Sequence, residues 1–124
     1  MLSDYPMLPT IPAHDLNRAR RWYAEKLGLT PVSEVSGALV YQTRLGGFLL
    51  FSSREAGRVE HQIAAWRVPD IDATVSALRG RGVQFEEYSE PGLQTVNGIA
   101  TTPAGRAAWF RDSEGNTLTI TQPV

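Results

Sequence analysis

The chain has 124 residues, 42% hydrophobic and 20% charged, as expected of an ordinary globular protein with one domain's length of chain. Twelve basic against thirteen acidic residues leave a net charge of −1, which argues against nucleic acid as a partner. No apolar run approaches the roughly 20 residues of a membrane span, and the start lacks a signal-peptide pattern, so we expect a cytoplasmic protein without a membrane partner. The absence of cysteine excludes disulfides, thiolate metal sites and a cysteine nucleophile.

The first predicted elements are an extended segment over residues 7–12 and a helix that follows it. Pro6, Pro9 and Pro12 cannot all lie in a central ladder, which favours an edge strand or a strand that crosses to another unit. Asp15 is typical of a helix N-cap, and Gly28 of a helix end. Between them, apolar side chains recur at helical spacing, at Leu16, Ala19, Tyr23 and Leu27.

Strand-like alternation takes over after the helix. Three strands are predicted at residues 30–35, 38–44 and 47–53. After a polar linker over residues 55–60, the order repeats with a strand at 61–68 and a helix at 71–81 that ends at Gly82. The remaining strands are predicted at 84–88, 99–101, 106–111 and 117–121, with residues 89–97 as a loop.

The chain therefore contains the same unit twice. Asp15 and Asp70 lie 55 residues apart, and each precedes a helix, a glycine and new strands. A fixed internal period indicates a fold built from a repeated unit. We predict an α+β fold in one domain, residues 1–124, made of two βαβββ modules at residues 1–57 and 58–124. Their curved mixed sheets are expected to enclose a cavity.

Three segments carry a resemblance to a known group. The run A-W-F-R-D-S-E-G-N-T-L-T-I at 108–120 resembles the ending of the vicinal oxygen chelate superfamily, and residues 15–29 and 70–83 are similar to its two helices. That superfamily holds the glyoxalase I, extradiol dioxygenase, fosfomycin-resistance and bleomycin-resistance families. The resemblance covers nearly the whole chain and implies the same fold.

In metal-using members the resemblance implies four inward His, Glu or Gln ligands, two from each module. The corresponding positions here are Leu8, Leu50, Ile63 and Thr119. Three of these have no donor atom, and divalent metals need several oxygen or imidazole donors. A register slip of two would bring His61 into the Ile63 position but would leave the others without donors. We expect no metal and no other cofactor.

Without a metal, the cavity becomes a pocket for a ligand. Residues two apart share a strand face, so Phe48 is expected to point inward with Leu50, and Arg67 with Ile63. Trp109 lies ten residues before Thr119, where the resembling fosfomycin-resistance enzymes have an inward tyrosine, and is the main candidate for stacking, with core filling as the alternative. Arg67 and Arg111, if inward, would be buried cations needing an anionic partner.

Other polar residues are expected to be structural. The arginines at 18, 20 and 21 fit a solvated helix face, with an acidic partner surface as the alternative. Asp112 and Glu114 fit turn positions, and His14 is expected to be exposed. No catalytic constellation is present.

Two functions remain open. The first is a metal-free protein that binds a small, aromatic or antibiotic-like molecule, resembling the bleomycin-resistance proteins, as a homodimer with sites shared between chains. The proline-rich start would then cross to the partner. The alternative is a superfamily enzyme (a metal-dependent lyase, a dioxygenase or a thiol transferase) with unusual site residues.

Overall fold

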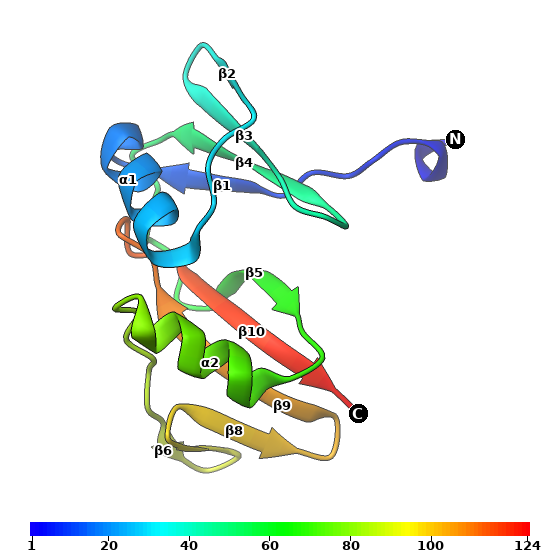
Figure 1. Ribbon diagram of the computed structural model, residues 1–124, viewed down its shortest axis with the longest axis vertical. Helices are drawn as coiled ribbons and strands as arrows, with labels where there is room; N and C mark the ends of the chain where they lie inside the picture. The colour runs from blue at the N-terminus through cyan, green and yellow to red at the C-terminus, as the bar shows by residue number, and fades with distance from the viewer.

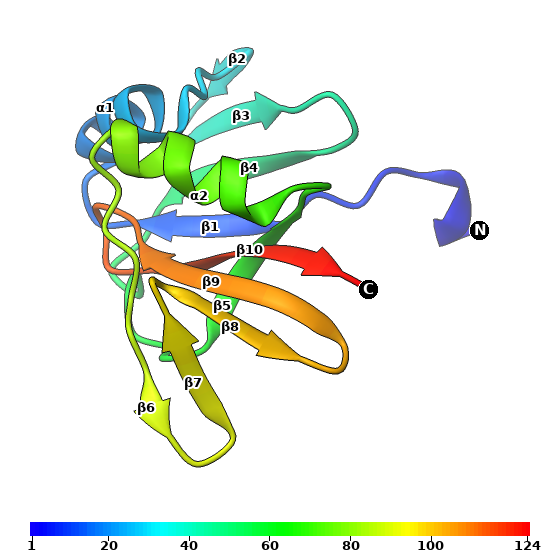
Figure 2. The ribbon, with the colours of Figure 1, turned by 60° about the horizontal axis from the view of Figure 1, so that its bottom comes forward.

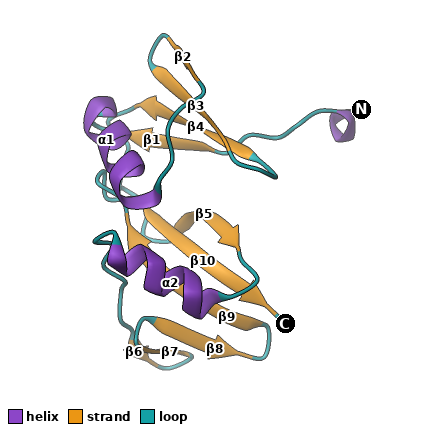
Figure 3. Ribbon diagram, viewed as in Figure 1, coloured by secondary structure: helices purple, strands orange, loops and turns teal.

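Two mixed sheets follow one another along the chain, and each carries one helix (Figures 1 and 3). The computed structural model describes residues 1–124. In the first sheet the strand order is β1-β4-β3-β2, from β1 Thr10–Ala13, β2 Ser33–Val35, β3 Ala38–Gln42 and β4 Gly47–Ser52. Helix α1, Leu16–Leu27, packs on β4, and a short 3-10 helix, Leu2–Asp4, precedes the sheet.

The second sheet has the order β5-β10-β9-β8-β7-β6. Its strands are β5 Gln62–Arg67, β6 Ser89–Glu90, β7 Leu93–Val96, β8 Ile99–Thr102, β9 Gly105–Arg111 and β10 Thr117–Pro123. Helix α2, Ile71–Gly80, packs on β9 and β10. In both sheets the strand before the helix pairs in parallel with the last strand of its half, β1 with β4 and β5 with β10. The α+β class is confirmed. The first half is βαβββ as predicted, and the second half has the same strand–helix start but six strands in its sheet.

Helix ends follow the capping signals in the sequence. The Asp15 carboxylate accepts a hydrogen bond from the Arg18 amide at 3.0 Å, and the Asp70 carboxylate accepts one from the Ala73 amide at 3.1 Å. Gly28 ends α1 with φ +70°, a conformation that costs glycine little. These caps are local, which is why the sequence alone predicts them.

The predicted region between α2 and β8 needs two corrections. Residues 84–88 do not form a strand; within them, Phe85 makes a single isolated β-bridge with Phe110 of β9. The predicted loop 89–97 contains the β6–β7 hairpin, with Pro91-Gly92 at its turn and Gly92 at φ +82°. A Pro-Gly pair is a strong turn signal between two strands, so this hairpin could have been predicted from the sequence.

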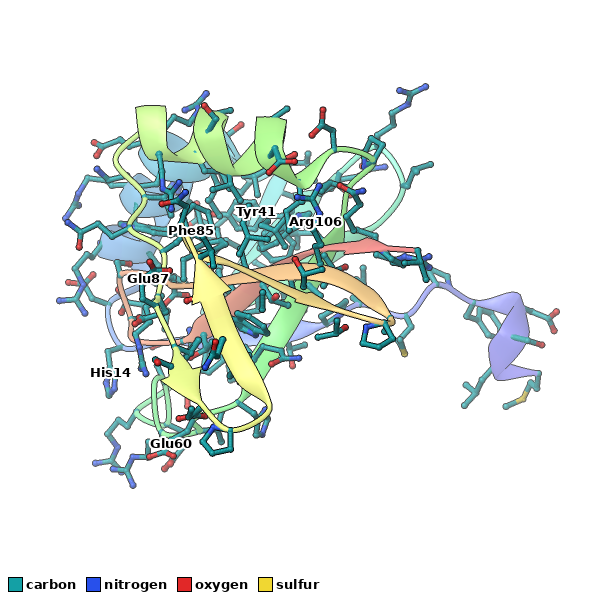
Figure 4. The ribbon with its side chains drawn as sticks, turned by 90° about the horizontal axis from the view of Figure 1, so that it is seen from below. His14, Tyr41, Glu60, Phe85, Glu87 and Arg106 are labelled. Carbon is teal, nitrogen blue, oxygen red and sulfur yellow. The ribbon has the colours of Figure 1, made fainter.

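The hydrophobic core joins the two modules. Trp22 of α1 stacks on Phe110 of β9 with ring centroids 6.3 Å apart, and Phe48 of β4 meets Trp66 of β5 at 6.4 Å. Seen from below, Tyr41 and Phe85 lie in the interior between the helices and the sheets (Figure 4). No helix is both long and apolar enough to span a membrane.

Residues 1–9, the N-terminal arm, run away from both sheets (Figures 1 and 2). The arm carries large apolar side chains that are exposed: Met1, Leu2, Tyr5, Met7 and Leu8. Only from Thr10 onward does the chain join a sheet, through the parallel ladder with β4.

Candidate functional site

A pocket of about 400 Å³ lies on the face of the second sheet that points away from the helices. Ala108 and Phe110 of β9 belong to the core, so Trp109 between them faces the opposite side. We call this the tryptophan pocket; it is lined by Glu60, Gln62, Tyr88, Glu90, Leu93, Trp109, Arg111 and Thr117. Glu60 lies beside the β6–β7 hairpin (Figure 4). Trp109 thus lines a pocket and is not part of the core cluster.

Two neighbours hold the Trp109 indole in place. Its Nε1–H donates to Gln62 Oε1 at 3.3 Å, and the Tyr88 ring meets it edge-on, with centroids 5.6 Å apart and planes at 87°. Burial, and next the negative charge of Glu86, raise the pKa of Tyr88, so its hydroxyl stays protonated at neutral pH and can donate to a ligand. Neither Gln62 nor Tyr88 is predicted from the sequence as a site residue. Both depend on strand geometry that residue order does not reveal.

Thr117 of β10 borders the pocket with an unsatisfied hydroxyl. The residue is 3% exposed, and its Oγ1 has no hydrogen-bond partner within the protein. A buried polar atom without a partner costs about 1–3 kcal/mol. Thr117 faces Arg111 across the β9–β10 ladder and Gln62 across the β5–β10 ladder, so the orphaned hydroxyl lies between two other polar pocket residues.

The charge of the tryptophan pocket differs from what the sequence suggests. Arg111 is half-exposed, and its guanidinium pairs with Glu86 at 3.2 Å and contacts the Gly115 carbonyl at 3.4 Å. The expectation of a buried cation in need of an anionic ligand is therefore wrong for Arg111. Glu60 and Glu90 are the other charged residues of the lining, so the pocket carries an acidic excess.

A second pocket, of about 610 Å³, is lined by other residues than the tryptophan pocket, among them Phe48 and Arg67. We call it the arginine pocket; its walls come from the arm, β1, the β3–β4 turn, β4 and β5, namely Met7, Pro9, Ile11, Thr43, Arg44, Leu45, Gly46, Gly47, Phe48, Ala64, Ala65, Trp66 and Arg67. Of the predicted ligand-pocket residues, Phe48 and Arg67 lie here, and Trp109 and Arg111 lie in the tryptophan pocket. Arg67 is exposed rather than buried. The predicted set therefore does not form one site.

The face assignment of β4 was wrong. Phe48 and Leu50 face α1 and belong to the core, with the Phe48 ring 5.9 Å from the Tyr23 ring and Leu50 fully buried. Phe48 also lines the arginine pocket, although it is only 5% exposed. Residues 48–51 read F-L-L-F, so both faces of the strand are apolar and the alternation carries no information about which one is inside.

The residues at the superfamily's metal positions do not fit a metal ion. Leu8 lies exposed in the arm, Leu50 is in the core, and Ile63 packs against the core. A register shift in the β5–β10 ladder pairs Gln62, not Ile63, with Thr117, so Ile63 is displaced from the expected position. Thr119 is buried and its hydroxyl donates to the Ala108 carbonyl at 2.9 Å.

No alternative set of metal ligands is present either. His61 is exposed, and its Nδ1 lies 2.8 Å from the Gln62 carbonyl. Nowhere do three His, Cys, Asp or Glu side chains gather as they would around a metal ion. Neither the four positions of the superfamily's metal ligands nor a cluster elsewhere therefore supplies the three or more His, Asp or Glu ligands that a divalent metal site typically uses.

Asp112 and Glu114 do more than shape a turn, contrary to expectation. Glu114 is 5% exposed and joins the modules: it accepts hydrogen bonds from the Asp15 amide at 2.8 Å and from the Arg18 Nε at 2.9 Å. Arg18 thus meets an acid within its own chain, not a partner surface. Asp112 accepts from the Tyr23 hydroxyl at 2.7 Å, and burial raises the pKa of Asp112 despite that bond. These polar contacts connect the β9–β10 turn to α1, and neither Asp112 nor Glu114 lines either pocket.

Comparisons with solved structures identify proteins of the same fold. TnmS3, an antibiotic binding protein from Streptomyces sp. CB03234, is 23% identical, covers 97% of this chain and 96% of its own, and superposes with a TM-score of 0.70. A bleomycin-binding protein complexed with bleomycin is 18% identical over 97% and 99% of the two chains, with a TM-score of 0.74. The E126Q mutant of the fosfomycin resistance protein FosX from Listeria monocytogenes, complexed with Mn(II) and a dihydroxypropylphosphonic acid, is 13% identical over 100% and 93%, with a TM-score of 0.65.

The sequence itself identifies the family. A search of curated proteins finds no significant match. The family model described as Glyoxalase/Bleomycin resistance protein/Dioxygenase superfamily, in contrast, matches residues 7–120, which include both sheets and both helices. The chain therefore belongs to the glyoxalase/bleomycin resistance protein/dioxygenase superfamily.

Proposed function

We propose that this protein binds a small aromatic molecule in the tryptophan pocket, without a metal, and acts by sequestering it. The observation that carries the proposal is the pairing of two aromatic walls, Trp109 and Tyr88, with the orphaned Thr117 hydroxyl at the same pocket. Ligand sites typically combine apolar and aromatic walls with a few placed polar groups. A ligand with a hydrogen-bonding group would satisfy the hydroxyl while its ring stacks on the indole.

The solved relatives support a binding role. Two proteins of the same fold are described as binding antibiotics, one of them bleomycin. The acidic residues at the tryptophan pocket, Glu60 and Glu90, favour a neutral or cationic aromatic ligand over an anionic one. An antibiotic-like aromatic compound fits this description. We place the protein in the cytoplasm, since a chain without cysteine takes no stability from an oxidising compartment.

A fluorescence screen of aromatic compounds tests the proposal, with Trp109→Ala as the decisive variant. Loss of the stacking surface should weaken binding of any hit by about 1 kcal/mol or more. The fold should survive, because Trp109 lies outside the core. The matched control is Trp22→Phe: Trp22 stacks on Phe110 in the core and lines neither pocket, so its substitution should leave affinity unchanged. Equal weakening in both variants would contradict the assignment, as would unfolding of Trp109→Ala without any hit.

We further propose that the protein is a homodimer held together by the N-terminal arm. The arm carries apolar side chains that stay largely exposed within their own chain, among them Tyr5 and Met7. Covering them on a second copy would gain roughly 25 cal/mol per Å² of apolar area. A twofold arrangement would bring side chains of both chains near each ligand site.

The dimer proposal has a direct test in sedimentation. The intact protein should sediment at twice the mass of one chain at micromolar concentration, and removal of residues 1–8 should shift it toward the monomer. The deletion ends before β1, so the first sheet should keep its ladder. An intact protein that sediments as a monomer would rule the dimer out.

A further inference from the structure

Two arginines whose guanidinium groups have no partner line the same pocket. Of the eleven arginines, five form ion pairs with carboxylates, and Arg79 and Arg81 donate to backbone carbonyls. The guanidinium groups of the remaining four make neither a hydrogen bond nor an ion pair within the chain: Arg21, Arg44, Arg54 and Arg67. Two of these four, Arg44 and Arg67, line the arginine pocket.

Each module contributes one of these two cations. Arg44 lies in the β3–β4 turn, which the Thr43 amide closes by donating to the Gly46 carbonyl at 2.8 Å. Arg67 is the last residue of β5, where the ladder pairs it with Thr121 of β10. No acidic side chain lines the pocket. Two positive charges at one cavity repel each other. An anion bound between them is attracted to both, and these two attractions outweigh the repulsion.

The rest of the pocket is apolar. Ile11, Phe48, Ala64 and Trp66 form its inner wall, and the volume of about 610 Å³ lies within the usual range of small-molecule sites. A guanidinium binds a carboxylate through two parallel hydrogen bonds, which makes arginine well suited to such groups.

We propose that the arginine pocket is a second binding site, for a small aromatic carboxylate. The carboxylate pairs with Arg44 and Arg67, and the ring lies against Trp66 and Phe48 in the wall of the pocket. The site is distinct from the tryptophan pocket, carries the opposite charge, and does not depend on what that pocket binds.

The test uses 2-naphthoate and its neutral analogue 2-naphthamide. The full chain contains three tryptophans, and each contributes one indole N–H resonance to a nitrogen–proton correlation spectrum. Trp66 lines the arginine pocket and Trp109 the tryptophan pocket, so the resonance that moves identifies the occupied site. We expect naphthoate to shift the Trp66 resonance at concentrations at which naphthamide does not. Arg44→Gln and Arg67→Gln should each weaken naphthoate binding roughly tenfold.

Two controls make the test decisive. Arg54→Gln removes the same charge from an unpaired, exposed arginine outside the pocket, and should leave the Trp66 shift unchanged. In Trp109→Ala, which lacks the stacking surface of the tryptophan pocket, naphthoate should still shift the Trp66 resonance. Trp66 also borders an apolar pocket of about 300 Å³ that is lined in addition by side chains of α1 and α2. A Trp66 shift that survives both arginine substitutions would place the ring there and overturn the proposal. No shift of the Trp66 resonance by naphthoate, an equal Trp66 shift by naphthamide, or equal weakening by Arg54→Gln would overturn it as well.

Discussion

Replacing Glu114 with glutamine should loosen the junction between the two modules. The Glu114 carboxylate lies in the β9–β10 turn and binds the first turn of α1 through the Asp15 amide and the Arg18 guanidinium. Burial alone would raise the pKa of Glu114; the hydrogen bonds from Arg18, Asp15 and Ser113 outweigh it and lower the pKa from 4.5 to about 2. Glutamine keeps the size but loses the charge, so Arg18 loses its ion pair.

The magnitude follows from linkage between ionisation and folding. A folded-state pKa of about 2 against 4.5 corresponds to about 3 kcal/mol of stability at neutral pH. Because Arg18 is 49% exposed and water screens the pair, we expect Glu114→Gln to cost about 2 kcal/mol. Since the folded pKa is depressed, this contribution is complete above pH 4.5 and is lost as the pH falls toward 2. The contribution of Asp112 to the pH dependence of stability has the opposite sign, because its pKa is raised. Asp112 is present in both the wild type and the variant, so its contribution cancels in the difference between their unfolding free energies.

Urea unfolding of the wild type and the variant, followed by circular dichroism, measures this difference. The gap in unfolding free energy should be largest near neutral pH and should shrink to roughly half near pH 3. Glu34→Gln is the matched control: Glu34 pairs with Arg20 at 3.0 Å, but both side chains are exposed, so its loss should cost under about 1 kcal/mol at any pH. A gap for Glu114→Gln that is independent of pH, or no larger than that of the control, would refute this reasoning.

Two further outcomes are expected. Thr117→Val removes the orphaned hydroxyl, so without ligand the variant should be as stable as the wild type or more stable by about 1 kcal/mol, as measured by urea unfolding; a clear loss would mean that the hydroxyl has a partner in solution. After incubation with Zn²⁺, Mn²⁺, Ni²⁺ or Fe²⁺ and desalting, elemental analysis should find no stoichiometric metal, because the side chains at Leu8, Leu50, Ile63 and Thr119 do not supply a ligand set. Stoichiometric metal that is lost on mutating pocket residues would favour the enzyme alternative.

The sequence by itself determined the elements whose signals are local. Asp15 and Asp70 start helices because a carboxylate three residues from a free amide needs only its own turn of chain to form the cap. Gly28 ends α1 because the left-handed conformation penalises other residues. The repetition of these signals after 55 residues was enough to predict two equivalent modules.

Only the tertiary structure decided which side of each strand faces the core and which side faces a pocket. A strand of apolar residues on both faces, such as β4, shows its inner face only when α1 packs on it, and Phe48 and Leu50 were therefore assigned to the wrong side. The register shift in the β5–β10 ladder brings Gln62 to Trp109 in place of Ile63. Ion pairs also depend on the tertiary structure. Arg111 pairs with Glu86, whereas no acidic side chain shares a pocket with Arg44. Long-range folding sets these distances, and distance governs how strongly charges interact.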